Sequence, residues 1–260
     1  MQLADSSSHR RAYFYGVPRQ DERRRPVLLH TPRMKDIIKR ISIIGPVARS
    51  IKRKLFPEEE FTTSEAYWIN RYARGGNSGA GSYNNLAEFK AEVLNAFVQE
   101  HHITSVIEFG CGDGNQLTYF KFPAYIGFDV SEVALNHCRT LFRDEPSKQF
   151  FPVSRAPGYT AELSLSLDVI YHLIEDATYH AYMAHLFKSS AQYVVIYACD
   201  DNRPQDYAPH VKPRKFTDWV KRYRPDFQLI DHIPNRFPLE AGKNSSTSFS
   251  DFFIYQKIAQ

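Results

Sequence analysis

The 260-residue sequence predicts an α/β fold in which helices cover both faces of a mostly parallel, doubly wound sheet of seven strands. Three observations indicate this fold. Short apolar runs alternate with amphipathic helical segments over residues 61–260, and the connections between them are short. The first apolar run leads directly into a glycine-rich turn. The last two predicted strands, 227–233 and 248–257, have no helix between them, which predicts a C-terminal antiparallel hairpin.

Two segments precede this predicted domain. Residues 1–32 are polar, rich in arginine and without periodicity, which predicts a disordered tail. Residues 33–60 predict a basic helical arm, because apolar residues recur at helical spacing from Ile37 to Leu55 and Gly45-Pro46 interrupts them with a kink. Such an arm either lies on an anionic membrane surface or docks on its own domain or on a second subunit, and the pattern leaves both open.

Charge is distributed unevenly along the chain. Residues 1–54 carry a net charge of +10, whereas the remainder carries −6, so the basic character belongs to the arm and tail. The acidic balance of the domain argues against a nucleic-acid partner. The three cysteines show neither a pairing pattern nor a metal-binding spacing, and no apolar run reaches the ~18 residues that span a bilayer. We therefore expect a cytoplasmic protein that the arm can hold peripherally at the inner face of the plasma membrane.

Two helices are predicted before the first strand, at 64–73 and 86–98. The first is rich in aromatic residues and also carries Arg71. The glycine- and serine-rich segment 75–82 joins the two helices, and it is interpreted either as a lid over a ligand or as a plain linker.

The turn after the first strand (106–109) carries the strongest functional signal. From Glu108 onwards it has the pattern E-x-G-x-G-x-G, and its glycines permit a sharp turn and close approach of a ligand to the backbone. Asn115 and the residues after it predict a helix whose free N–H groups face the same turn. Dinucleotide-binding turns have the spacing G-x-G-x-x-G, and an acid two residues before the first glycine suits a cationic ligand better than a pyrophosphate. The spacing therefore disfavours a dehydrogenase.

This turn resembles the first motif of class I S-adenosylmethionine-dependent methyltransferases, and two later segments agree with it. Strand 124–130 contains Asp129, placed where the resemblance implies a carboxylate that accepts the ribose hydroxyls. Strand 163–170 continues through Asp168 to His172 and looks like the fourth-strand motif of the same superfamily. The resemblance covers roughly residues 64–258 and implies a Rossmann-like sheet that binds S-adenosylmethionine; the alternative is such a sheet without a cofactor. The implied cofactor contacts are Arg71 (to the methionine carboxylate), Glu108, Gly110, Cys111, Gly112, Asn115, Asp129, Val130 and Asp168.

The remaining elements follow the same periodicities. Helices are predicted at 132–142, 177–188 and 215–223, and further strands near 149–153 and at 192–198.

His172 is the candidate catalytic residue. It follows a predicted strand at the carboxyl edge of the sheet, where ligands of such sheets bind, and imidazole titrates near neutrality. Its alternative role is to orient the loop by hydrogen bonding.

A basic cluster follows the fifth predicted strand at the same edge. This cluster suggests a site for an anionic acceptor such as a phosphorylated or uronic sugar. The alternative is that these side chains belong to a solvated loop without a ligand. Its members are Arg203, His210, Lys212, Arg214 and Lys215, of which Arg203, His210 and Arg214 are the predicted substrate contacts.

The sequence thus predicts methyl transfer from S-adenosylmethionine. The glycine-rich segment, the fourth-strand motif and the basic arm look similar to bacterial methyltransferases of surface-polysaccharide or glycolipid assembly, which implies a sugar or phosphosugar acceptor. Two alternatives remain open: an O- or N-methyltransferase of small metabolites, and a catalytically silent scaffold that binds the cofactor.

Overall fold

The computed structural model describes residues 61–202, 208–240 and 246–259, which belong to one compact unit, Glu60–Gln260. The predicted tail, the predicted arm and Arg203 lie outside the described residues. None of the described helices is long and apolar enough to cross a membrane.

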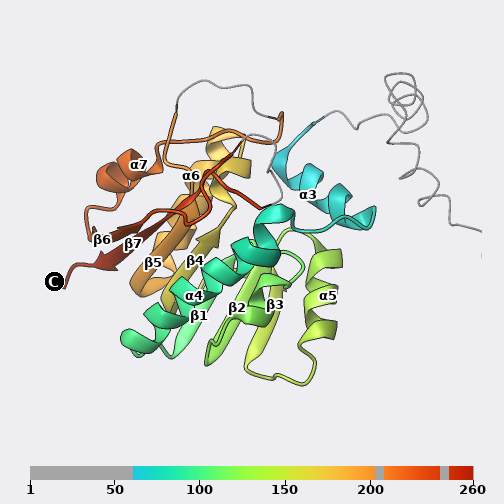
Figure 1. Cartoon of the computed structure of the whole chain (residues 1–260), viewed down its shortest axis with the longest axis horizontal. Coiled ribbons are helices and arrows are strands. Elements are labelled where there is room, and N and C mark those ends of the chain that lie inside the picture. The colour runs from blue at the N-terminus through green and yellow to red at the C-terminus, as the bar shows by residue number, and fades with distance from the viewer. Residues whose placement is uncertain (1–60, 203–207, 241–245, 260) are drawn as a thin grey trace, which may run out of the picture. The chain divides into compact units, whose positions relative to one another are not determined.

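The described residues form one seven-stranded sheet with the order β3-β2-β1-β4-β5-β7-β6 (Figure 1). The first five strands in chain order pair in parallel, and β7 is antiparallel to both β5 and β6. This confirms the predicted mostly parallel sheet and its C-terminal hairpin. The strands are β1 (Ser105–Phe109), β2 (Ala124–Asp129), β3 (Lys148–Pro152), β4 (Ala161–Leu167), β5 (Ser190–Ala198), β6 (Phe227–Ile233) and β7 (Asp251–Lys257).

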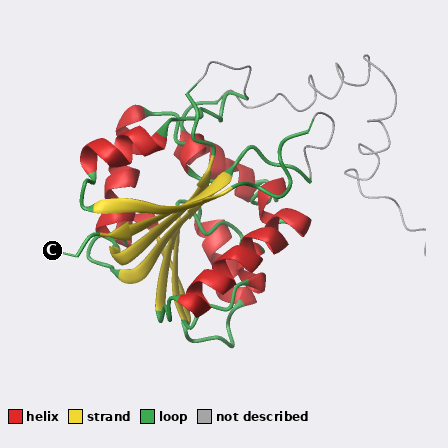
Figure 2. Cartoon of the chain, turned by 60° about the vertical axis from the view of Figure 1, so that its left-hand side comes forward, coloured by secondary structure: helices red, strands yellow, loops and turns green. Residues whose placement is uncertain are grey.

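Helices cover both faces of the sheet, as Figure 2 shows. Apolar side chains of α4 and α5 pack into a core on one face, and those of α6 and α7 pack into a core on the other. Burying both faces explains why the central strands are apolar along their whole length. The described helices are α3 (Ser64–Ala73), α4 (Asn84–Glu100), α5 (Glu132–Leu141), α6 (Asp176–Lys188) and α7 (Phe216–Tyr223).

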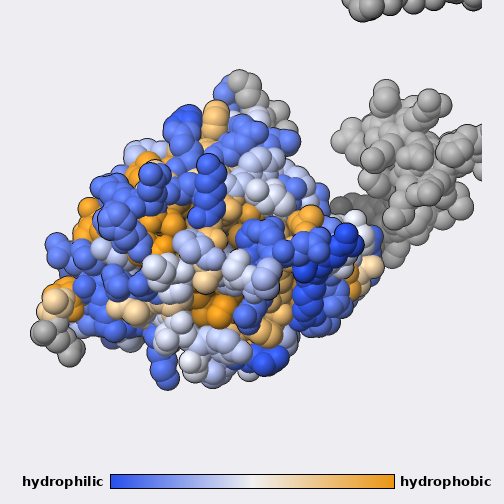
Figure 3. All heavy atoms as spheres, turned by 90° about the horizontal axis from the view of Figure 1, so that it is seen from below, coloured by the Kyte–Doolittle hydropathy of each residue, from blue (hydrophilic) through white to orange (hydrophobic). Residues whose placement is uncertain are grey.

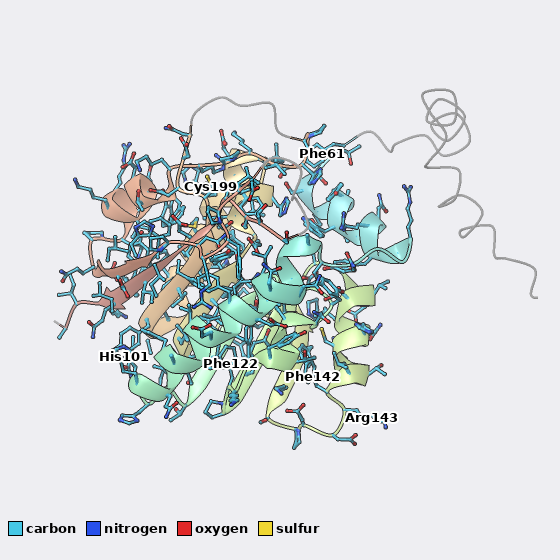
Figure 4. The ribbon with its side chains drawn as sticks, in the orientation of Figure 1. Phe61, His101, Phe122, Phe142, Arg143 and Cys199 are labelled. Atoms are coloured by element: carbon cyan, nitrogen blue, oxygen red, sulfur yellow. The ribbon has the colours of Figure 1, made fainter. Side chains whose placement is uncertain are left out.

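Aromatic rings fill much of the core beneath α4 and α5. Figure 4 shows Phe122 and Phe142 toward the lower end of this layer, where Phe122 stacks on Tyr125 and Phe142 stacks on Phe150. The view from below in Figure 3 shows small apolar patches set among polar side chains, as is ordinary for a protein surface.

Two segments near the glycine-rich turn differ from the prediction. The helix expected from Asn115 is only a 3₁₀ turn, Gln116–Tyr119, because Phe120 is already extended and Pro123 prevents the helix from continuing. Strand β4 ends at Leu167 rather than at residue 170, because Asp168 has a left-handed backbone with φ of 59°. The chain then forms a second 3₁₀ turn, Ile170–His172.

The parallel arrangement brings the carboxyl ends of three strands together. The register pairs Phe109 at the end of β1 with Phe128 of β2, and β4 lies on the other side of β1. The turns after β1, β2 and β4 therefore meet at the carboxyl edge of the sheet, where α3 also lies (Figure 1).

Candidate functional site

A cavity of about 390 Å³ opens at this carboxyl edge. Its walls come from α3, the segment 75–82, the turns after β1 and β2, the loop after β4 and the flank of α6. Most of the wall is apolar or aromatic, with a small number of polar groups, which is the usual composition of a small-molecule site.

The glycine-rich turn lines the cavity with Gly110, Cys111 and Gly112. Gly110 and Gly112 have φ of 87° and 59°, which favours glycine. A Cβ atom at Gly110 would lie 2.5 Å from Cγ2 of Val169, and one at Gly112 would lie 2.3 Å from Oγ of Ser78. Val169 and Ser78 therefore occupy the space that a side chain at these two positions would fill.

Asp129, at the end of β2, lines the cavity beside this turn. Its Oδ2 accepts the N–H of Gly112 at 2.9 Å, and its Oδ1 accepts the N–H of Ser131 at 2.9 Å. Burial raises the pKa of Asp129 to about 6, although these backbone hydrogen bonds oppose the shift. Each oxygen keeps a lone pair, so the carboxylate can still accept hydroxyl donors from a ligand. Cys111 and Val130 also line the cavity.

Glu108 does not reach the cavity. Its side chain is fully buried, with Oε1 accepting from Nε2 of Gln116 at 3.1 Å and Oε2 accepting from the hydroxyl of Tyr125 at 2.6 Å. Burial raises the pKa of Glu108 to about 7. Glu108 therefore lies outside the cavity wall, where it ties β1 to β2 and to the 3₁₀ turn.

Asn115 and Arg71 are also absent from the cavity wall, and both fasten the segment 75–82. Nδ2 of Asn115 donates to the carbonyl of Ser82 at 2.8 Å. Nε of Arg71 donates to the carbonyl of Asn77 at 2.6 Å, and its guanidinium lies 5.4 Å from the ring of Trp68. Both side chains contact the protein here, and their predicted cofactor contacts stay predictions.

Asp168 lines the cavity, but protein donors already satisfy its carboxylate. Oδ2 pairs with Nζ of Lys90 at 2.6 Å, and Oδ1 accepts from the hydroxyls of Tyr171 at 2.9 Å and Ser250 at 3.1 Å. The Lys90 side chain is completely buried. Sequence reasoning missed this pair, although one signal was present: Lys90 interrupts the apolar face of α4 next to Phe89.

His172 lies in the cavity wall at the predicted position, with the ring of Trp68 edge-on at 4.9 Å between centroids. Its Nδ1 lies 2.8 Å from the carbonyl oxygen of His210. Because a carbonyl only accepts, Nδ1 must carry the proton, which leaves Nε2 as a free acceptor. Burial lowers the pKa of His172 to about 4, so the ring is neutral at physiological pH.

The described lysine and arginine residues of the basic cluster contact acceptors within the protein. Arg214 donates to Oδ1 of Asp176 at 2.7 Å and to the carbonyls of Leu173 and Ile174 at 3.0 Å each, so it braces the loop before α6. His210 stacks on Tyr67 at 4.3 Å and on His172 at 5.5 Å between ring centroids, and its carbonyl accepts from Nδ1 of His172. Lys212 pairs with Asp176 and Lys215 with Asp200, and among the described residues no lysine or arginine lines the cavity.

No protein-family model matches the sequence, and no curated protein matches it. Solved structures do match the fold. The N-methyltransferase NodS from Bradyrhizobium japonicum WM9, solved with S-adenosyl-L-homocysteine, aligns with a TM-score of 0.58 and 12% identity over 75% of this chain and 99% of that one. Magnesium protoporphyrin IX methyltransferase (ChlM) from Synechocystis PCC 6803 with bound SAM aligns with a TM-score of 0.52 and 13% identity, over 77% of this chain and 100% of that one.

A putative O-methyltransferase from Klebsiella pneumoniae gives a TM-score of 0.52 and 10% identity over 82% of this chain and 96% of that one. At such identities the likeness concerns the fold. The described domain has the Rossmann-like fold of class I methyltransferases, as the sequence predicts.

Proposed function

We propose that the protein is an S-adenosylmethionine-dependent methyltransferase. One observation carries the proposal: a buried carboxylate, Asp129, lies beside a side-chain-free glycine turn in a cavity large enough for an adenosyl amino acid. The methyltransferases of the same fold whose structures contain this cofactor or its product support the proposal.

The residues of the cavity fit this cofactor. Asp129 would accept the ribose hydroxyls, and Val130 with Val153 offers an apolar surface to the base. Gly110 and Gly112 line the cavity and would face the amino-acid end of the cofactor. S-Adenosylmethionine supplies an electrophilic methyl group on a sulfonium, and the sulfur keeps the electron pair when the methyl group leaves.

The acceptor side is formed by α3 and the loop after β4. Trp68 presents an aromatic wall, and Nε2 of His172 accepts a hydrogen bond from the acceptor hydroxyl and takes its proton as the oxygen bonds to carbon. Because burial lowers the pKa of His172, it is a weaker base than an exposed imidazole. Alignment of the reactants and exclusion of water must therefore supply most of the rate enhancement.

For the acceptor, we propose a sugar hydroxyl of a cell-surface glycan or glycolipid. The aromatic wall suits the apolar face of a sugar ring. The absence of lysine and arginine among the described lining residues favours an uncharged hydroxyl over a phosphate. If the basic arm binds the inner face of the plasma membrane, it would bring the enzyme to lipid-linked acceptors.

The test is transfer of a deuterated methyl group to glycan and lipid fractions of the source cells, followed by mass spectrometry. We expect a mass shift in a sugar-containing product with the wild-type protein and a strongly reduced yield with Asp129→Ala at limiting cofactor. A labelled metabolite without sugar would reassign the acceptor. Cofactor binding without transfer to any fraction would support a silent scaffold instead.

A further inference from the structure

The segment 75–82 crosses over the glycine-rich turn and contributes Ser78 and Ser82 to the cavity wall. Apolar packing does not explain its position, because Gly75, Gly76 and Asn77 are exposed and half of the segment is glycine. Polar contacts therefore have to hold it in place, from Arg71 of α3 and from the glycine-rich turn.

Asp113 makes most of these contacts from within the turn. Its Oδ2 accepts the N–H of Ser78 at 2.9 Å and the hydroxyl of Tyr83 at 2.7 Å, and its Oδ1 accepts the N–H of Asn115 at 3.1 Å. In return, the N–H of Asp113 donates to Oγ of Ser78 at 2.9 Å. The hydroxyl of Tyr72 shares the same Ser78 oxygen at 2.8 Å.

The other end of the segment contacts Asn115, just after the turn, and the loop after β4. Asn115 binds the carbonyl of Ser82, and a Cβ atom at Gly81 would lie 2.7 Å from Oδ2 of Asp168. The segment is thus attached at both ends, and Ser78 lies directly over Gly112. It covers the glycine side of the cavity, whereas Val130 and Val153 line the cavity just after β2 and β3.

The carboxylate of Asp113 stays ionised over the neutral pH range. Burial alone would raise its pKa, but the hydrogen bonds from Tyr83, Ser78 and Asn115 outweigh burial and lower the pKa below its ordinary value. Hydrogen bonds to an ionised acceptor are about twice as strong as neutral ones.

We propose that Asp113 is a positioning residue that latches the segment 75–82 as a roof over the amino-acid end of the bound cofactor. The inference rests on the proposed function. The roof opens to admit S-adenosylmethionine and closes over it, while the acceptor side at Trp68 and His172 stays accessible. S-Adenosylhomocysteine therefore leaves only after the latch is released.

The test compares two ligands with four proteins. S-Adenosylhomocysteine has the amino-acid end, whereas 5′-methylthioadenosine carries the adenosyl group without it. In Asp113→Asn, we expect dissociation of S-adenosylhomocysteine to accelerate roughly tenfold by stopped-flow, with 5′-methylthioadenosine affinity unchanged within a factor of two. Tyr83→Phe, which removes one latch bond outside the cavity wall, should give a smaller acceleration. Asp144→Asn is the matched control, since that carboxylate is exposed and distant in sequence from the turn.

Two outcomes would overturn the latch, and a third would overturn the proposed function. Equal dissociation rates in Asp113→Asn and Asp144→Asn would overturn the latch. Loss of both ligands in Asp113→Asn and in Tyr83→Phe would also overturn it, because Asp113 would then maintain the fold rather than the roof. If the wild-type protein binds neither ligand, the proposed function itself fails.

Discussion

Replacing Lys90 by methionine tests how the loop after β4 is held. The side chain of Lys90 is completely buried, and its Nζ lies 2.6 Å from Oδ2 of Asp168 at the cavity wall. Methionine has a similar length and keeps most of the packing within α4 and against Tyr197, so the substitution removes chiefly the charge.

The expected loss can be estimated from the contacts that remain. Breaking a buried ion pair by removing one partner costs about 3–5 kcal/mol. Asp168 keeps the hydroxyl donors of Tyr171 and Ser250 and is 12% exposed, so we expect the lower end, about 3 kcal/mol. For a domain of this size that corresponds to a fall in Tm of about 6–12 °C.

Urea denaturation would measure this loss in the free energy of unfolding. A double-mutant cycle would show whether it comes from the pair of Lys90 and Asp168. The double variant Lys90→Met/Asp168→Asn should recover part of the stability, because it leaves no unpaired charge. A loss below about 1 kcal/mol in Lys90→Met, or additive losses in the double variant, would refute the view that this pair holds the loop.

Three further predictions follow from the site and the arm. Because burial raises the pKa of Asp129 to about 6 and the ionised form is the better acceptor of ribose hydroxyls, S-adenosylhomocysteine affinity should be constant above pH 7 and should weaken as the pH falls through 6. Calorimetry across this range checks it, and an Asp129→Asn variant that keeps the same pH dependence would contradict it. His172→Ala should reduce turnover by about 10²-fold or more while S-adenosylhomocysteine affinity stays within a factor of a few; near-normal turnover would move the proton acceptor elsewhere. Deletion of residues 1–55 should abolish co-sedimentation with anionic liposomes and spare cofactor binding, and equal sedimentation of the full chain with neutral vesicles would remove the electrostatic explanation.

The sheet was predictable because each of its signals is local. Apolar runs mark the parallel strands, and the missing helix between β6 and β7 marks the antiparallel pair. The position of Asp129 was also predictable, because this residue ends β2. His172 lines the cavity although β4 ends at Leu167, three residues earlier than predicted. The helix predicted from Asn115 was wrong, and the sequence signal against it was Pro123.

The partners of the charged side chains were not predictable from such local signals. Glu108 has the spacing of a ligand-binding acid, yet Tyr125 from the next strand and Gln116 draw it beneath the turn. Arg214 is in a basic run, yet Asp176, 38 residues away along the chain, turns it inward. Which partner a charged side chain meets depends on packing between distant elements, and spacing along the sequence does not encode it. The role of Asp113 was missed for the same reason.

The proposed function requires that the cavity beside Asp129 binds S-adenosylmethionine. Isothermal titration calorimetry with S-adenosylhomocysteine and with NAD, on the wild-type protein and Asp129→Ala, tests it most directly. We predict micromolar affinity for S-adenosylhomocysteine, no measurable heat with NAD, and a loss of about 1.5–3 kcal/mol in the variant, the range for hydrogen bonds to a charged group. Binding of NAD in preference to S-adenosylhomocysteine, or unchanged affinity in Asp129→Ala, would contradict the account.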